Sequence, residues 1–278
     1  MEVTMLRLLI YELRSRIGAV IGWGIGLTAF GAMYISIFPE VSEQMTSLAD
    51  FSIYRAMGME MATFEGYIAS VVILFVPLLL GIYAIVTGTK SLAGEEESGT
   101  LELLLATPLR RWQIVSMKTA AIAIIMAVTL VLAGLGNALV LIPIKQSVDV
   151  GVEPMQLCGA VISAWPLVMA FAMIGLFFGA FLPSRRLAAI TTTVIFVASY
   201  FGENISEMVA SLEPVKPLSL FSYFDSTSAI FTVGLDLADT GLLVGIGALF
   251  FVLTLVSFGA RNVTTGAWPW QRGRPEEN

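Results

Sequence analysis

Six long runs without a charged side chain are the feature that most constrains how this chain can fold. The runs that lack Asp, Glu, Lys and Arg are 17–39, 66–89, 119–144, 154–184, 187–202 and 240–260. A helix of about 20 apolar residues crosses a hydrocarbon core of roughly 30 Å. Allowing for the helix ends, we expect six membrane spans, at 17–39, 66–89, 114–144, 158–183, 187–203 and 240–260.

The composition places most of the chain in lipid. Of its 278 residues, 57% are hydrophobic and 13% are charged, and the mean hydropathy is +0.86. A soluble domain has roughly 25% charged residues, so this chain lacks the charge to cover a water-facing surface. Cys158 is the only cysteine and there is no histidine, which excludes an intrachain disulfide and any imidazole-based zinc site or base. We expect an all-α integral membrane protein, a single domain over 1–278, with no catalytic residue and no metal.

The basic residues gather on one side of the expected spans. Only Arg55, Lys145 and Lys216 fall on the other side. The twelve on the first side are Arg7, Arg14, Arg16, Lys90, Arg110, Arg111, Lys118, Arg185, Arg186, Arg261, Arg272 and Arg274. Loops rich in Lys and Arg stay in the cytoplasm, so this bias predicts that both termini and the tail 261–278 are cytoplasmic.

Two segments outside the spans have helical or apolar character. Residues 1–16 predict a helix that lies in the cytoplasmic membrane interface, because apolar side chains recur at helical spacing, at Leu6, Leu9, Ile10, Leu13 and Ile17. The outer segment 203–239 is rich in Phe, Leu and Val and contains Pro214 and Pro217. It predicts one or two short helices that re-enter the outer leaflet, packed against protein. An ordinary surface loop is the alternative.

The segment between the second and third spans has the most unusual pattern. Three glutamates at 95–97 precede Ser98-Gly99-Thr100, a leucine-rich run follows, and Pro108 ends it. The pattern predicts two short helices bent around Gly99, with Thr100 capping the second helix. Three glutamates alone would indicate a solvated run beside a span. The glycine, threonine and leucines behind them favour a segment that docks on a cytosolic partner.

The run from Glu95 to Pro108 resembles the cytoplasmic signature of the type 2 ABC transporter permeases, the bacterial exporters of antibiotics, lipids and polysaccharides. The stretch Arg55–Tyr67 is similar to the first outer loop of that family, and the resemblance is nearest to its antibiotic and multidrug branch. It implies that a coupling helix between spans two and three docks on an ATPase subunit. The residues implied in docking are Glu95, Glu96, Glu97, Gly99, Thr100, Leu101, Glu102, Pro108 and Arg110.

The resemblance also implies partners that this chain lacks. No G-x-x-x-x-G-K-[ST] motif occurs, and Gly88-Thr89-Lys90-Ser91 lacks the upstream glycine spacing. We therefore expect that this chain is not an enzyme and binds no cofactor, and that ATP and Mg are held by two copies of a separate P-loop ATPase. A second copy of this chain, or a close paralogue, would complete the pathway. We expect the plasma membrane of a bacterium or archaeon, no nucleic acid, and a hydrophobic or amphipathic cargo such as a drug, antibiotic, peptide or lipid.

Polar residues in the spans are few. Asn137, Glu203 and Asn204 are candidates to line the pathway, although Asn137 also suits a hydrogen bond between helices and the other two suit a plain helix end. The span cores carry no charge, which disfavours an ion-coupled carrier. A sensing or envelope-remodelling role for an ATP-linked permease-like subunit remains open. Small residues at Gly18, Gly22, Gly24, Gly26 and Gly31 would permit close helix approach in the first span.

Overall fold

The structure is a computed structural model that describes residues 2–48, 63–147 and 150–260. Every regular element within these ranges is helical, which confirms the all-α prediction. The first half of the chain contains α1 (Glu2–Ser15), α2 (Ile17–Leu48), α4 (Phe64–Ile68), η1 (Ala69–Ile73), α5 (Phe75–Thr89), η2 (Lys90–Gly94), α6 (Glu95–Glu97), α7 (Thr100–Leu105) and α8 (Arg111–Ser147). The second half contains α9 (Pro154–Ile162), α10 (Trp165–Phe181), α11 (Arg185–Met208), η3 (Ala210–Leu218), η4 (Phe221–Tyr223), η5 (Ser228–Phe231) and α12 (Leu237–Ala260).

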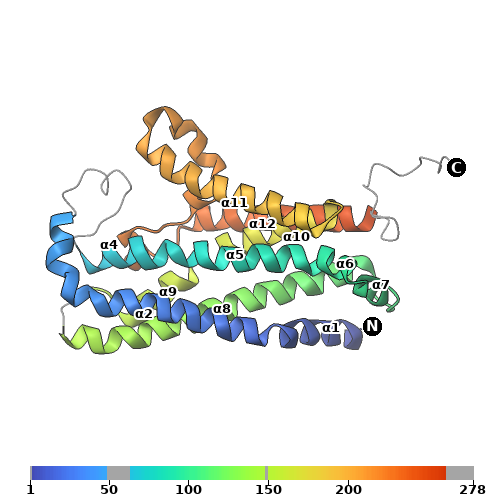
Figure 1. Ribbon diagram of the computed structural model, residues 1–278, viewed down its shortest axis with the longest axis horizontal. Coiled ribbons are helices and arrows are strands. Elements are labelled where there is room, and N and C mark those ends of the chain that lie inside the picture. The colour runs from blue at the N-terminus through green and yellow to red at the C-terminus, as the bar shows by residue number, and fades with distance from the viewer. Residues whose placement is uncertain (1, 49–62, 148–149, 261–278) are drawn as a thin grey trace.

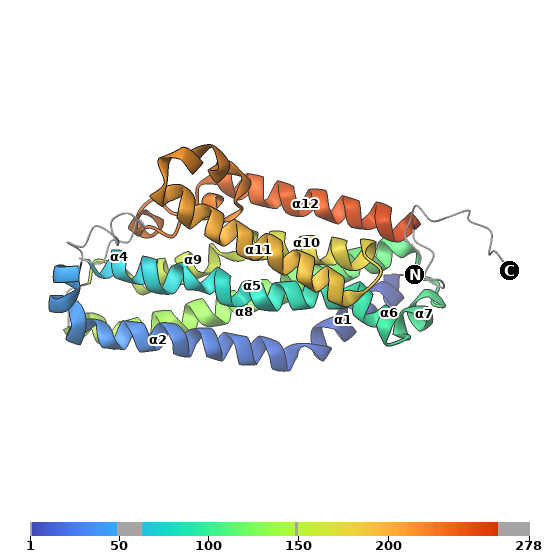
Figure 2. The ribbon, with the colours of Figure 1, turned by 45° about the horizontal axis from the view of Figure 1, so that its top comes forward.

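The long helices lie side by side along the longest axis of the molecule (Figure 1). Helix α10 packs between α5 and α12, and α2 packs on α8. One end of the bundle holds α1, α6, α7, the turn between α10 and α11, and the last turn of α12 (Figures 1 and 2). We call this the N-terminal end and the opposite end the far end. The tail 261–278 and most of the stretch Arg55–Tyr67 lie outside the described residues.

Five helical segments in the described part of the chain are long and apolar enough to cross a membrane. They are Ile17–Glu40, Phe64–Glu97, Arg111–Gln146, Pro154–Phe181 and Leu237–Ala260. These five correspond to the spans expected at 17–39, 66–89, 114–144, 158–183 and 240–260. The sixth expected span, 187–203, is helical as part of α11. It is not among the five, because its threonines and its polar end lower its mean hydropathy. Its crossing of the membrane stays a prediction.

The fourth expected span, 158–183, contains a break between two helices. α9 ends at Ile162 and α10 begins at Trp165. The break follows from Pro166, which has no N–H to donate to a carbonyl of the preceding turn. The indole Nε1 of Trp165 donates to the Ala123 carbonyl of α8 at 3.1 Å, so the break is fixed against a neighbouring helix.

The segment after α11 folds back along that helix. The Ser219 hydroxyl donates to the Ser199 carbonyl at 2.7 Å, and the Leu220 N–H donates to the Ser199 hydroxyl at 2.7 Å. The chain has therefore reversed after Met208 and returned to the level of Ser199 through η3. This hairpin of α11 and η3 projects sideways from the bundle (Figure 1). A fold-back of this kind is what a re-entrant segment requires, and its depth in the membrane stays a prediction.

Glycines permit the closest approaches between helices. A Cβ atom at Gly88 of α5 would overlap the backbone of α10 at Ala172. In α2, Gly24 faces Leu132 and Gly31 faces Asn137 of α8. The other glycines that the sequence singled out in this helix, Gly18, Gly22 and Gly26, lie on its exposed side, where an added Cβ atom would meet nothing within 4 Å.

Replacing Gly88 tests whether the α5–α10 contact holds the bundle together. We expect Gly88→Ala to lower the free energy of unfolding by about 1–3 kcal/mol, because the added methyl group meets backbone that cannot rotate away. The thermal unfolding midpoint of the purified protein in detergent measures this. Gly245→Ala on α12 is the matched control, since a Cβ there meets nothing within 4 Å. A midpoint for Gly88→Ala equal to that of the control would contradict the tight contact.

Candidate functional site

Two short helices at the N-terminal end carry the acidic segment. α6 ends at Glu97, and Gly99 takes the left-handed conformation, with φ of 71°, before α7 begins at Thr100. Glycine adopts this conformation without steric cost, so the bend predicted at Gly99 is confirmed. The predicted cap is wrong. Gly99 is itself the N-cap of α7, and the Thr100 hydroxyl turns back to donate to the Glu95 carbonyl at 3.3 Å.

A buried lysine ties this segment to two other helices. Lys118 lies two turns inside α8, and its side chain is fully buried. Its Nζ donates to Glu12 Oε1 of α1 at 2.5 Å and to Glu95 Oε1 of α6 at 2.5 Å. The side chain of Glu12 is 5% exposed and that of Glu95 is 26% exposed. One cation therefore holds two carboxylates from segments that are far apart in the sequence.

Arg16 extends this cluster to the start of the first span. Its Nη2 lies 3.2 Å from Glu12 Oε2 and donates to the Ser91 hydroxyl at 3.2 Å. Ser91 lies in η2 and in turn donates to the Thr87 carbonyl of α5 at 2.7 Å. We call Glu12, Arg16, Ser91, Glu95 and Lys118 the ion cluster. It connects α1, α2, η2, α6 and α8, and its charges compensate one another where water is largely excluded.

The residues predicted to dock on a partner divide between the two faces of the α6–α7 segment. Glu95, one of the residues implied in docking, points inward to Lys118. Leu101 is buried and anchors α7 in the core. The exposed face carries Glu97, Gly99, Thr100, Glu102, Leu103, Pro108 and Arg110, while Glu96 is half-buried. Leu103 is 73% exposed.

A cavity of about 400 Å³ lies beside the ion cluster. Its walls come mainly from α1, α2, α5, η2 and α6, and they carry both signs of charge, from Glu12, Arg16, Lys90 and Glu95. The hydroxyl of Tyr83, which lines the cavity, is buried and has no hydrogen-bond partner. Its ring stacks on Trp23 with centroids 5.7 Å apart. The cavity therefore combines aromatic, apolar and charged surfaces at the N-terminal end.

The structure does not bring the candidate pathway residues together. Asn137 is fully buried between α8 and α2, opposite Gly31, and neither its amide oxygen nor its amide nitrogen has a partner. Glu203 and Asn204 lie at the end of α11, in the hairpin. Glu203 pairs with Lys216 of η3 at 3.4 Å, and Asn204 donates to the Tyr200 carbonyl at 2.8 Å. All three could still face a pathway formed with another chain, and that role stays a prediction.

Sequence reasoning missed the ion cluster. The charge pattern groups Lys118 with the basic residues beside the spans and Glu12 with the charges of the N-terminal helix. A signal is present, since a lysine within the expected span 114–144 needs a buried partner. The carboxylates that pair with it are far away in the sequence, so the partner could not be assigned. Among the described residues, no group of three or more His, Cys, Asp or Glu side chains is arranged to hold a metal ion.

The sequence matches a known family over nearly the whole chain. The family is described as ABC-2 family transporter protein, and the match covers residues 7–263. It includes α1 from Arg7 onward, all five candidate spans, the α6–α7 segment and the hairpin. A comparison with curated proteins gave no match.

Removing the buried cation tests the ion cluster. We expect Lys118→Met to lower the free energy of unfolding by about 3 kcal/mol, because it leaves the Glu95 carboxylate without its cation and the buried Glu12 carboxylate with Arg16 alone. Neutralising those carboxylates in the same chain, with Glu12→Gln and Glu95→Gln, should recover most of the loss. The thermal unfolding midpoint in detergent reports both changes.

Lys145→Met is the matched control on the same helix. Lys145 pairs with Glu153 at the far end, where both side chains are partly exposed, so its removal should cost no more than about 1 kcal/mol. Equal losses from Lys118→Met and Lys145→Met, or a triple variant no better than Lys118→Met, would show that the cluster does not stabilise the fold.

Proposed function

Because the chain belongs to the ABC-2 family of transporter proteins, we propose that it is the permease subunit of an ATP-driven exporter, which forms its pathway as a dimer. Two copies of a separate ATPase subunit would dock at the N-terminal end, which we assign to the cytoplasm. The cargo would be a hydrophobic or amphipathic molecule such as a drug, antibiotic, peptide or lipid. The membrane would be the plasma membrane of a bacterium or archaeon.

The observation that carries this proposal is the two-faced α6–α7 segment. Its outer face presents Glu97, Glu102 and the exposed Leu103, a combination suited to a partner with basic groups and an apolar pocket. Its inner face is held by Leu101 in the core and by the Glu95–Lys118 ion pair. A partner that moves this segment therefore acts on α8 and α1 as well. Such attachment is what a coupling helix needs.

A separate ATPase subunit is implied by the composition of the sequence and by the charges in the spans. The 278 residues include no P-loop motif, so ATP and Mg would be bound by the docked subunit. The only buried ionised cluster we find among the described residues lies at the N-terminal end, and its charges already pair with one another. Ion-coupled carriers instead keep such groups near the middle of the membrane, where an ion can bind and leave.

Three observations support a second copy of the chain, or a close paralogue, as the other half of the pathway. The apolar window of α2 is only 22% buried, compared with 72% for the α9–α10 span. The exposed side of α2 carries Gly18, Gly22 and Gly26, spaced four residues apart, as in helix pairs that pack closely in membranes. Helix α11 also exposes an apolar face, at Leu187, Ile190, Val194, Val197 and Phe201. In this arrangement α11 is the remaining span, and two copies enclose the pathway between α2, α5 and α11.

The cavity beside the ion cluster is the place where we expect cargo to enter. It lies between α2 and α5, at the end assigned to the cytoplasm, and offers Tyr83 beside paired charges. An amphipathic molecule would place its apolar part along the aromatic wall and its polar part at the charged rim. Its volume of about 400 Å³ falls within the range of roughly 300–1,000 Å³ that is common for small-molecule sites.

Charge reversal on the outer face tests docking directly. We expect the double variant Glu97→Lys and Glu102→Lys to weaken binding of the ATPase subunit by about tenfold or more, because two favourable charge contacts become repulsive. ATP-driven transport in vesicles should fall in parallel. Glu213→Lys, an exposed acid in η3 at the hairpin, is the matched control and should change neither quantity. Unchanged binding and transport in the double variant would contradict docking at this face.

Gentle purification of the tagged chain from its native membrane identifies the partner. We expect a soluble P-loop protein to co-purify at about one copy per chain and to be lost from the double variant, with mass spectrometry as the measurement. Transport by the reconstituted complex should require ATP. Transport driven by an imposed proton gradient without ATP would favour an ion-coupled carrier, and an ATPase partner without transport would favour a sensing or remodelling role.

A further inference from the structure

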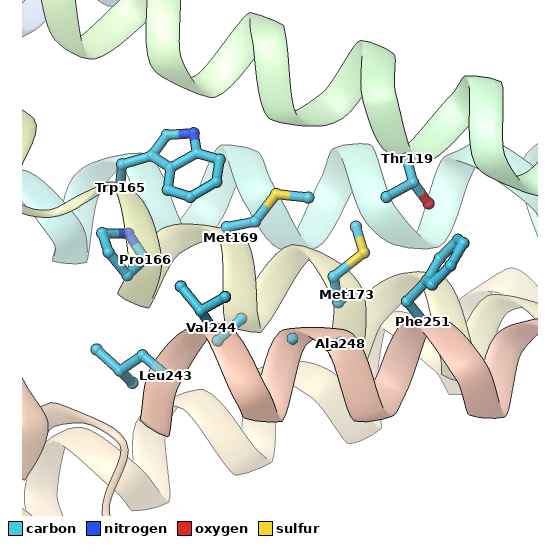
Figure 3. A pocket seen from close by; sticks show the side chains of 11 residues that line it. Thr119, Trp165, Pro166, Met169, Met173, Leu243, Val244, Ala248 and Phe251 are labelled. Atoms are coloured by element: carbon cyan, nitrogen blue, oxygen red, sulfur yellow. The ribbon is translucent and has the colours of Figure 1, made fainter. Parts of the chain in front are cut away.

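A second cavity lies within the span region, away from the ion cluster. It has a volume of about 210 Å³ and is enclosed by α8, α10 and α12. Figure 3 shows Met169 and Met173 of α10 on one wall, Val244 and Phe251 of α12 on another, and Thr119 of α8 at one end. For scale, a cavity of about 150 Å³ in a protein core accommodates benzene.

This cavity offers too few polar atoms to hold a water molecule. Ten of its eleven lining residues are apolar, and the exception is Thr119, whose hydroxyl oxygen is buried without a hydrogen-bond partner and could supply one contact at most on its own. The indole N–H of Trp165 already donates to the Ala123 carbonyl. A buried water needs two to four polar partners, so the lining suits an apolar ligand.

The cavity is elongated and open on one side. Its lining on α10 runs from Trp165 to Met173, and its lining on α12 runs from Leu243 to Phe251. Each stretch covers eight residue steps, or about 12 Å at 1.5 Å per residue. Leu243 and Met173 are buried, whereas Val244 is 47% exposed and Ala248 is exposed. The mouth therefore lies on the outward face of α12, a span only 28% buried within the protein.

We propose that this slot is a binding site for one acyl chain of a bilayer phospholipid. The slot is parallel to the spans, as acyl chains are, and its mouth opens on the face of α12 that lies in the hydrocarbon region. Methionine side chains are flexible and polarizable, so Met169 and Met173 can adapt to a mobile chain. The site is formed by one protomer, on α8, α10 and α12, and does not depend on the pathway proposed between α2, α5 and α11.

Glycine 247 offers a way to close the slot without disturbing the helices. A Cβ at Gly247 would lie 3.9 Å from Ala170 Cα and from Met173 Cγ, which is ordinary contact. In Gly247→Leu the remaining atoms of the side chain occupy the cavity. Gly245→Leu is the matched control, because position 245 lies on the same helix, is exposed, and has nothing within 4 Å of its Cβ position.

The test uses the full chain in phosphatidylcholine vesicles that contain a phosphatidylcholine with a photoreactive diazirine in the middle of one acyl chain. After irradiation, mass spectrometry of the digested protein locates the labelled residues. We expect labelling of Met169, Met173 and Leu243 in the unmodified chain and in Gly247→Leu a decrease of about tenfold at the α10 positions, the loss expected when about two methylene groups lose their burial. Gly245→Leu should label as the unmodified chain does.

Labelling confined to the exposed face of α12, at Val252 and Val256, or labelling of Met169 and Met173 that is unchanged in Gly247→Leu, would overturn the proposal. If Gly247→Leu does not insert, Ala248→Phe replaces it, because this exposed residue lies at the mouth and its substitution blocks the slot from outside. Strong labelling of the α10 methionines by a photoreactive hydrophobic drug, with none by the phospholipid, would also overturn it.

Discussion

Lipid offers no hydrogen-bond partner, and the rest of this structure depends on that constraint. Each backbone N–H and C=O group in the span region must find its partner within the protein, which is why the described elements are all helical. Four buried threonine hydroxyls also find a partner within their own helix, because they donate to the carbonyl four residues earlier at 2.7–2.8 Å, at Thr89, Thr129, Thr192 and Thr254. A charged side chain has no such local solution. Lys118 therefore pairs with two carboxylates from other helices, and these contacts hold the N-terminal end together.

The constraint also explains which features the sequence could predict. Charge-free runs located the five apolar segments, because a span is defined by its length and composition alone. Gly99 marked the bend between α6 and α7, because only glycine takes a positive φ freely. The wrong prediction at Thr100 came from placing the cap one residue late, since the glycine occupied the capping position itself. The break before Trp165 had a signal in Pro166, but a proline within a long apolar run does not indicate whether the helix bends or stops.

Contacts between segments that are far apart in the sequence could not be predicted from local sequence patterns. Glu12, Glu95 and Lys118 become neighbours only when α1 and α6 fold against α8, so no spacing rule connects them. The sequence also did not predict which face of each span is exposed and which is buried, because α2, α10 and α12 are all apolar along most of their length. In the structure α10 is central, whereas α2 and α12 keep most of their surface outside. A sequence pattern cannot separate a surface that meets lipid from one that meets another protein chain when both are apolar.

The ion cluster gives a physical reason why a docked partner could move the spans. A helix of six residues, such as α7, is too short to be stable by itself, so it can transmit a displacement only through its anchors. Those anchors are Leu101 in the core and the Glu95 carboxylate on Lys118. Separating Glu95 from Lys118 would leave a buried cation short of one partner, which is destabilising. The segment α6, the helix α1 and the first turns of α8 should therefore move as one body. This body has two borders where the backbone can change direction, the break in the helix at Arg16 and the bend at Gly99.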